Sequence, residues 1–214
     1  MKILAVDTAL GACSVALIEG KRSLAHRHEF MERGHAEALA PMVEKTMHDA
    51  KLEFSSLDRL AVTTGPGTFT GQRVGLAFMR GLRIALHRPL SGITTLAAMA
   101  EAAKAETGLA CAIALHDARR DEVYVEIDNG PEVLPFDEVV RMLRNIESGM
   151  PIALAGTAAV RACDALSKKF VLSTIRQPDA LWVARLAAIA DETDSAPRPL
   201  YLRAPDAKLP VVRL

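Results

Sequence analysis

The chain has 214 residues, of which 50% are hydrophobic and 24% charged, which is the balance of a globular protein with one large domain or two small lobes. The number of Lys and Arg residues, 26, equals the number of Asp and Glu residues, which excludes a protein that binds nucleic acid through a surface that is basic overall. An aspartate stands at position 7 and no apolar run approaches membrane-spanning length, so we expect neither a signal peptide nor a membrane span. Three cysteines lie in apolar runs, which favours buried, reduced thiols and a cytoplasmic protein: Cys13, Cys111 and Cys163.

The first half of the chain predicts three strands, a helix, a strand and a second helix. Strands are expected where apolar and β-branched residues run or alternate between turn residues. Helices are expected where apolar residues recur at helical spacing, and Pro41 should kink the first of them. The expected elements are strands 2–7, 13–18 and 23–29, helix 33–50, strand 60–64 and helix 72–86.

The second half repeats this order after a linking strand at 90–93 and a helix at 95–107. Asn129-Gly130 is a strong hairpin signal, and the proline-rich tail after Asp194 should wrap the surface as an extended strap. The expected elements are strands 110–116, 122–128 and 132–134, helix 136–146, strand 151–155, helix 157–167, strand 170–173 and helix 180–190. Duplicated βββαβα lobes are the plan of the actin, sugar-kinase and Hsp70 superfamily. We therefore expect this two-lobed α/β fold (ASKHA) with a reduced second lobe, divided into residues 1–95 and 96–214.

The most distinctive stretch runs from Leu60 to Leu86 and contains GPGTFTG at positions 65–71. A strand, a glycine loop and a helix in this order let backbone N–H groups face an anion or a close neighbour. The loop is not a Walker A loop, because Gln72 and Arg73 stand where Lys and Ser or Thr would follow, and its GxGxxxG spacing is not that of a Rossmann fingerprint. Two interpretations stay open, a tight turn before a closely packed helix that Thr70 caps, or a ligand-binding loop.

The helix after this loop is apolar on two sides. At 100° per residue, one side should face the domain's own sheet: Val74, Gly75, Phe78, Gly81, Leu82 and Ala85. A basic stripe lies opposite: Arg73, Arg80, Arg83 and His87. Between them runs a second apolar strip: Leu76, Met79 and Leu86. The helix is either wedged between two internal layers or offers the second strip to a partner protein.

Other residues offer little support for chemistry within this chain. Asp7, at the end of the first strand, either helps to handle phosphate and metal or caps its own turn. Asp117 and Asp121 in DARRDE are either candidate bases or part of a charged turn. His26 and His28 point the same way on one strand, but no third metal ligand has a suitable spacing to them. HExxH and GxSxG are absent from the sequence, and we assign no catalytic residue, no metal and no cofactor.

Several segments together resemble the TsaB (YeaZ) family over nearly the whole chain: KILAVDTALGACSVAL, HAEAL, TTGPGTFTGQRVGLAFMRGL, SGITTLAAMA, DARRDEVY and PRPLYLR. The resemblance implies a non-catalytic scaffold or activator subunit in the formation of threonylcarbamoyladenosine next to the anticodon of tRNAs that read ANN codons. It implies pairing with a TsaD-like transferase subunit, cooperation with a TsaE-like ATPase, a homodimer when the chain is alone, and contact with tRNA through the complex.

The resemblance also implies roles for particular positions. The catalytic relative holds its metal with HxxxH on the first helix, and the matching positions here are His35 and Leu39, so one ligand is lost. Family complexes associate through the first two helices, which implies these contact residues: Leu39, Met42, Leu76, Met79, Arg80 and Arg83. A vestigial nucleotide site would use Asp7, Thr8, Gly65 and Gly67. The alternatives are a small ATP-binding phosphotransferase of the same superfamily and a glycoprotease-like peptidase, as older labels of the family have it.

Overall fold

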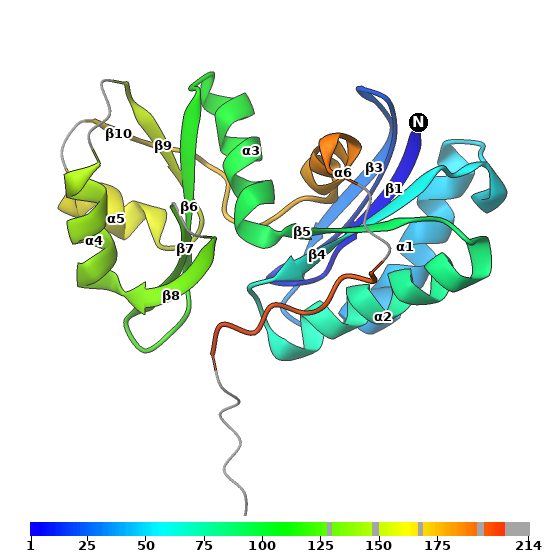
Figure 1. Cartoon of the computed structure of the whole chain (residues 1–214), viewed down its shortest axis with the longest axis horizontal. Coiled ribbons are helices and arrows are strands. Elements are labelled where there is room, and N and C mark those ends of the chain that lie inside the picture. Colours follow the sequence, from blue (N-terminus) through cyan, green and yellow to red (C-terminus); the bar gives the residue numbers. More distant parts are fainter. Residues whose placement is uncertain (128–129, 147–149, 167–168, 192–194, 204–214) are drawn as a thin grey trace, which may run out of the picture.

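The computed structural model describes residues 1–127, 130–146, 150–166, 169–191 and 195–203. These residues form two lobes side by side, each built on a five-stranded sheet, with helix α3 between the sheets (Figure 1). The elements in chain order are β1 (Lys2–Asp7), β2 (Ala12–Glu19), β3 (Arg22–Phe30), α1 (His35–Asp49), a short 3-10 helix (Phe54–Ser56), β4 (Arg59–Gly65), α2 (Phe69–Leu86), β5 (Leu90–Thr94), α3 (Thr95–Thr107), β6 (Cys111–Asp117), β7 (Glu122–Glu126), β8 (Pro131–Pro135), α4 (Phe136–Asn145), β9 (Ile152–Ala155), α5 (Ala159–Ala165), β10 (Phe170–Leu172) and α6 (Ala180–Ile189).

The first sheet has the strand order β3-β2-β1-β4-β5. The first three strands are antiparallel, while β4 and β5 run parallel to β1. Side chains of β1 and β2 alternate between two buried faces, as the pleat of a strand requires. One face packs under α1 and α2 and includes Leu4, Val6, Val15 and Leu17. The opposite face packs under α6 and includes Ile3, Ala5, Ala16 and Ile18.

Helix α6 comes from the far end of the chain but covers the first sheet (Figure 1). Its buried side is mostly alanine, which lets the helix lie close to small residues of β1 and β2: Ala180, Val183, Ala184 and Ala187. The division at residues 95 and 96 separates the two sheets. Helix α6 leaves the second lobe, however, and completes the first.

The second sheet has the strand order β10-β9-β6-β7-β8. Helices α4 and α5 pack on one face, and α3 packs on the other. Strands β7 and β8 form an antiparallel pair, as the hairpin signal at Asn129-Gly130 predicts, although residues 128–129 lie outside the described residues. The predicted order of strands and helices is confirmed in both lobes. None of the described helices is long and apolar enough to cross a membrane.

Three local predictions are wrong. Helix α2 begins at Phe69 instead of Gln72, because the side chain of Thr68, and not of Thr70, accepts the cap hydrogen bond from the Gly71 amide at 3.1 Å. Its core-facing side is also different, because Leu76 (2% exposed) and Met79 (0%) are buried whereas Gly81 is exposed. The third error concerns the cysteines, since only Cys13 is buried while Cys111, at the start of β6, is exposed and Cys163 is half-buried.

Candidate functional site

The turn between β1 and β2 packs directly against the glycine loop before α2. The Thr68 amide donates to the Ala9 carbonyl at 2.8 Å, and the Thr95 hydroxyl donates to the Pro66 carbonyl at 2.7 Å. A Cβ atom built on Gly67 would lie 2.4 Å from the Ala9 carbonyl oxygen, closer than atoms pack. The GPGTFTG stretch is therefore a tight turn before a closely packed helix, which is one of its two interpretations.

Thr8 fastens this turn to α2. Its hydroxyl donates to the Gly71 carbonyl at 2.7 Å and accepts from the Gly75 amide at 3.0 Å. Cβ atoms on Gly71 and Gly75 would lie 2.2 Å and 2.7 Å from oxygens of Thr8, so glycine is required for this approach. The hydroxyl therefore makes two hydrogen bonds within the protein, and the whole residue is only 1% exposed.

Asp7 is fully buried beneath the same turn. One carboxylate oxygen accepts from the Thr63 hydroxyl at 2.6 Å and from the Ala9 amide at 3.2 Å, so Asp7 caps its own turn. The other oxygen has no hydrogen-bond partner among the described residues. Burial raises the pKa of Asp7 from 3.8 to about 7, against the lowering effect of these two hydrogen bonds. The structure brings Asp7, Thr8, Gly65 and Gly67 together, and the vestigial nucleotide site drawn from them stays a prediction.

A cavity of about 820 Å³ separates the two lobes beside this turn. It is lined by residues from the first lobe, the second lobe and the segment 200–203, among them Arg33, Gln72, His116, Gln177 and Tyr201. Gln177 closes one side, because its side chain accepts from the Gly11 amide at 2.9 Å. Sequence reasoning did not single out Gln177 or His116, since neither stands in a recognisable motif.

His116 is the buried titratable group of this cavity on the second lobe. It is 8% exposed, and its Nδ1 atom has no hydrogen-bond partner among the described residues. Burial lowers the pKa of His116 to about 4, so the imidazole is neutral near pH 7. The following Asp117 accepts from the Arg119 amide at 2.8 Å, and Asp121 pairs with Arg161 at 2.5 Å. DARRDE thus forms the charged turn between β6 and β7.

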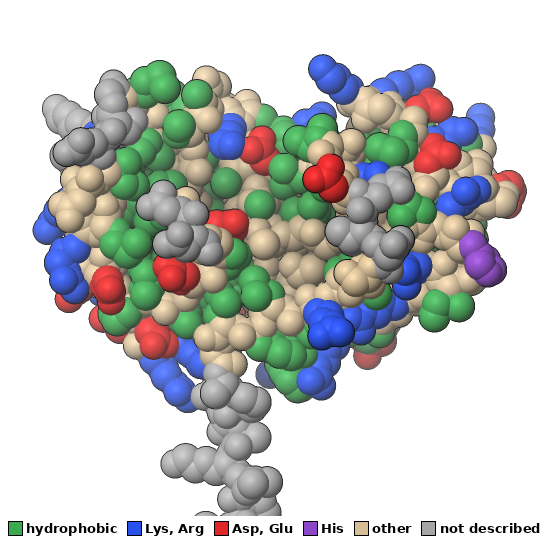
Figure 2. Space-filling view, viewed as in Figure 1, with side chains coloured by type: hydrophobic (Ala, Val, Ile, Leu, Met, Phe, Trp, Pro, Cys, Tyr) green, Lys and Arg blue, Asp and Glu red, His purple; other side chains and the backbone are tan. Residues whose placement is uncertain are grey.

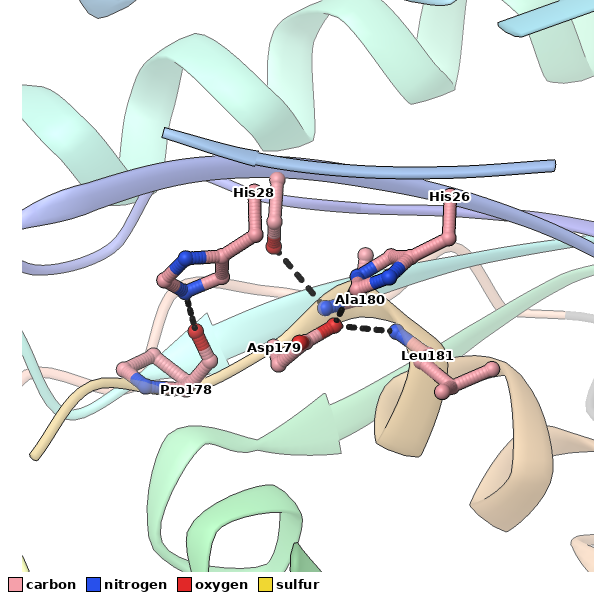
Figure 3. Close-up of polar contacts among 7 residues, drawn as sticks. His26, His28, Pro178, Asp179, Ala180 and Leu181 are labelled. Carbon is pink, nitrogen blue, oxygen red and sulfur yellow. Dashed lines mark hydrogen bonds and ion pairs between the residues drawn. The ribbon is translucent and has the colours of Figure 1, made fainter. Parts of the chain in front are cut away.

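The histidine pair on β3 ties that strand to the segment before α6 (Figure 3). His26 donates to the Asp179 carboxylate at 2.8 Å, and His28 contacts the Pro178 carbonyl at 3.3 Å. Asp179 also caps α6 by accepting from the Leu181 amide at 2.8 Å. Burial alone would raise the pKa of Asp179, but the hydrogen bonds from His26 and Leu181 outweigh it and hold the pKa below its ordinary value. Across the described residues no three His, Cys, Asp or Glu side chains gather in a group that could hold a metal.

Residues 195–203 form an extended strap along α2 (Figure 1). Lys and Arg side chains gather over this part of the first lobe (Figure 2). Arg80 donates to the Pro197 carbonyl, and Arg73 donates to the Tyr201 hydroxyl at 2.8 Å. The predicted strap is confirmed over these residues, while residues 204–214 lie outside the described part. The basic stripe on α2 therefore binds the strap through Arg73 and Arg80.

The predicted partner-contact residues divide into two groups. The four apolar ones are buried in the core of the first lobe, at 0–5% exposure: Leu39, Met42, Leu76 and Met79. Arg80 and Arg83 are half-buried at the side of α2. The outer face of α2 is instead made of small residues and one isoleucine, namely Ala77, Gly81, Ala85 and the 71% exposed Ile84.

Comparison with known proteins places the chain in a family. The family profile described as TsaD, tRNA N6-adenosine threonylcarbamoyltransferase, matches residues 28–174. The "tRNA threonylcarbamoyladenosine biosynthesis protein TsaB" of Haemophilus influenzae is 31% identical over 227 aligned positions, which cover 95% of this chain and 94% of that protein. This chain belongs to the TsaB (YeaZ) family.

Other members of the TsaB family agree with this assignment. The Escherichia coli TsaB is 39% identical over 124 residues, which cover 58% of this chain and 53% of that protein. The solved structure of YeaZ from Pseudomonas aeruginosa superposes with a TM-score of 0.78 at 30% identity and covers 94% of this chain and 99% of that one. Component A of the (R)-2-hydroxyglutaryl-CoA dehydratase of Acidaminococcus fermentans has a TM-score of 0.51 at 12% identity, over 87% of this chain and 97% of that one, and shares the fold alone. The predicted resemblance and the two-lobed ASKHA fold are confirmed.

Proposed function

We propose that this chain is a non-catalytic subunit in the formation of threonylcarbamoyladenosine on tRNA, and that it pairs with a TsaD-like transferase. Its relatives are tRNA threonylcarbamoyladenosine biosynthesis proteins, which supports a role in this pathway. A TsaE-like ATPase and tRNA then belong to the same assembly, and a second copy of this chain takes the place of the transferase when the chain is alone.

The observation that carries the non-catalytic role lies on α1. His35 is buried, and its Nε2 atom contacts the Leu10 carbonyl oxygen at 3.0 Å, so the imidazole holds the β1–β2 turn against the helix. One helical turn later stands Leu39, which is 1% exposed in the core. Two imidazoles four residues apart on one helix face can share a metal, whereas an imidazole and a buried leucine cannot. This supports the view that the transfer reaction takes place on the partner chain.

The outer face of α2 is the surface that we propose for the partner. Ala77, Gly81 and Ala85 carry no bulky side chain there, and nothing lies within 4 Å of the position of a Cβ on Gly81. Small side chains let the axis of a second helix come close. Ile84, 71% exposed at the edge of this face, supplies an apolar contact. The buried Leu76 and Met79 support this face from below, while Arg80 and Arg83 flank it.

Replacement of Ala77 by arginine tests this surface without disturbing the core, because Ala77 is exposed on the monomer. Burying an unpaired guanidinium between two helices costs several kcal/mol. We expect Ala77→Arg to weaken association with the TsaD-like protein of the same source at least 100-fold, as measured by size-exclusion chromatography with light scattering. In a reconstituted reaction the variant should lower threonylcarbamoyladenosine formation in parallel.

Ala105→Arg is the matched control, because Ala105 is an exposed alanine on α3, away from α1 and α2. It should assemble and support the reaction as the unchanged chain does. Normal assembly of Ala77→Arg would place the partner elsewhere. Threonylcarbamoyladenosine formation by the unchanged chain without the TsaD-like protein would overturn the non-catalytic role.

A further inference from the structure

The strap, residues 195–203, is attached to the first lobe at its beginning. Pro197 packs on Gly92 so closely that a Cβ on that glycine would lie 2.6 Å from the proline ring. The Pro197 carbonyl oxygen accepts a hydrogen bond from Nε of Arg80, on α2, at 3.2 Å. Further along, the Leu200 amide donates to the Thr64 carbonyl at 2.8 Å. These contacts join the strap to β4, β5 and α2.

An aromatic stack secures the middle of the strap. The Tyr201 ring stacks on Phe69, with 5.6 Å between ring centroids and 27° between planes. The Arg73 guanidinium lies 3.5 Å above the Phe69 ring and donates to the Tyr201 hydroxyl at 2.8 Å. Contacts of an arginine with an aromatic ring and of two stacked rings are each favourable, so this cluster fixes the direction in which the strap leaves α2.

Arg203 carries the strap across to the second lobe. Its Nη1 donates to the Ala118 carbonyl at 2.9 Å, and its Nη2 forms an ion pair with Glu122. Ala118 and Glu122 are themselves joined at 2.9 Å across the turn between β6 and β7. Arg203 therefore holds the β6–β7 turn of the second lobe, only three residues after Leu200 is held by the first lobe.

The same residues of the strap form part of the wall of the cavity between the lobes. Leu200, Tyr201, Leu202 and Arg203 line it together with His116 and Gln72 from the two lobes. We propose that the strap is a latch that ties the two lobes together and controls access to the cavity between them. Release of either end of the latch opens the cavity, and reattachment closes it. This property belongs to the isolated chain and does not rest on the proposed function.

Chemical modification of histidine measures this access. His116 lines the cavity and is 8% exposed, whereas the side chain of His48, on α1, is 90% exposed and serves as an internal reference. The unchanged chain and Arg203→Ala are treated with diethylpyrocarbonate, and the modification rate of each histidine is followed by mass spectrometry. We expect the ratio of the His116 rate to the His48 rate to rise about tenfold in Arg203→Ala.

Arg144→Ala is the matched control, because Arg144 also donates to a backbone carbonyl, that of Ala165 at 3.0 Å, but does not contact the strap. Its ratio should equal that of the unchanged chain. Arg80→Ala releases the opposite end of the strap and should raise the ratio as Arg203→Ala does, with little further increase in the double variant. An unchanged ratio in both single variants would overturn the latch.

Hydrogen exchange at one amide gives an independent readout. The Leu200 amide is bonded to the first lobe, whereas Arg203→Ala removes a contact with the second. A strap that acts as one unit should exchange at least tenfold faster at Leu200 in this variant. Unchanged exchange at Leu200 would mean that the strap contacts are separate, which contradicts a latch.

Discussion

Replacement of Asp7 by asparagine should change how the stability of this protein depends on pH. Asp7 is fully buried, and burial is the main cause that raises its pKa from 3.8 to about 7. Asparagine keeps an oxygen that can accept from Thr63 and Ala9, but it does not ionise. The two proteins therefore differ mainly in the free energy of placing a carboxylate in this site.

The sign and size follow from linkage between protonation and folding. Below pH 3.8 the Asp7 carboxyl is protonated in both the folded and the unfolded chain, so its burial does not lower the free energy of unfolding. As the pH rises from 3.8 through 7, the free energy of unfolding falls, because Asp7 ionises at a lower pH in the unfolded chain than in the folded chain. At about 1.4 kcal/mol for each pKa unit, the total loss is about 4 kcal/mol. About 2.5 kcal/mol of it falls between pH 5 and pH 8.

Urea unfolding of both proteins at pH 5 and pH 8 tests this. We expect the free energy of unfolding of Asp7→Asn, relative to the unchanged chain, to increase by about 2.5 kcal/mol from the lower pH to the higher. Asp191→Asn, at an exposed acid after α6, reports the effect of the substitution itself. The same relative stability of Asp7→Asn at both pH values would refute the argument that burial keeps this carboxyl protonated.

Two further predictions concern packing. Gly71→Ala should destabilise the protein by about 2–3 kcal/mol, because its Cβ would lie 2.2 Å from the Thr8 carbonyl oxygen, whereas Gly81→Ala on the same helix meets open space and should stabilise by up to about 1 kcal/mol. Thermal unfolding of the pair checks this, and equal effects would contradict the close approach at Gly71. Arg59→Met should cost about 2–3 kcal/mol, because buried Arg59 donates to the Ala187 and Ala190 carbonyls at the end of α6. A loss below about 0.5 kcal/mol in urea unfolding would show that these carbonyls find other partners.

The order of elements could be predicted from the sequence because each signal is local. Strands β1 and β2 are apolar on both faces, as strands covered by helices on both sides must be, and hairpin and helix signals mark the remaining boundaries. The glycines of the loop before α2 also indicated a tight turn. These features depend on residues close in sequence, where spacing carries the information.

The orientation of α2 could not be predicted in this way. The helix has apolar residues around more than half of its circumference, and its buried side includes Gln72, whose amide donates to the Gly67 carbonyl at 3.0 Å. A helical wheel drawn with only apolar residues in the core therefore places the buried side of α2 roughly 90° away from the side that is buried in the structure. The use of Arg73 and Arg80 to bind the strap was equally hidden, because each bond joins residues more than 100 positions apart.

The position of α6 has a consequence for the synthesis of the protein. The apolar face formed by Ile3, Ala5, Ala16 and Ile18 is covered only when Ala180–Ile189 has been made. At 5–20 residues per second, the ribosome needs roughly 5–20 seconds to add the chain from the end of β5 to the end of α6. During that time all five strands of the first sheet are present, but one hydrophobic side of the sheet is uncovered. We therefore expect a chaperone to bind this side of the nascent chain. Truncation before α6 should yield an insoluble product even though every strand of the first lobe is present.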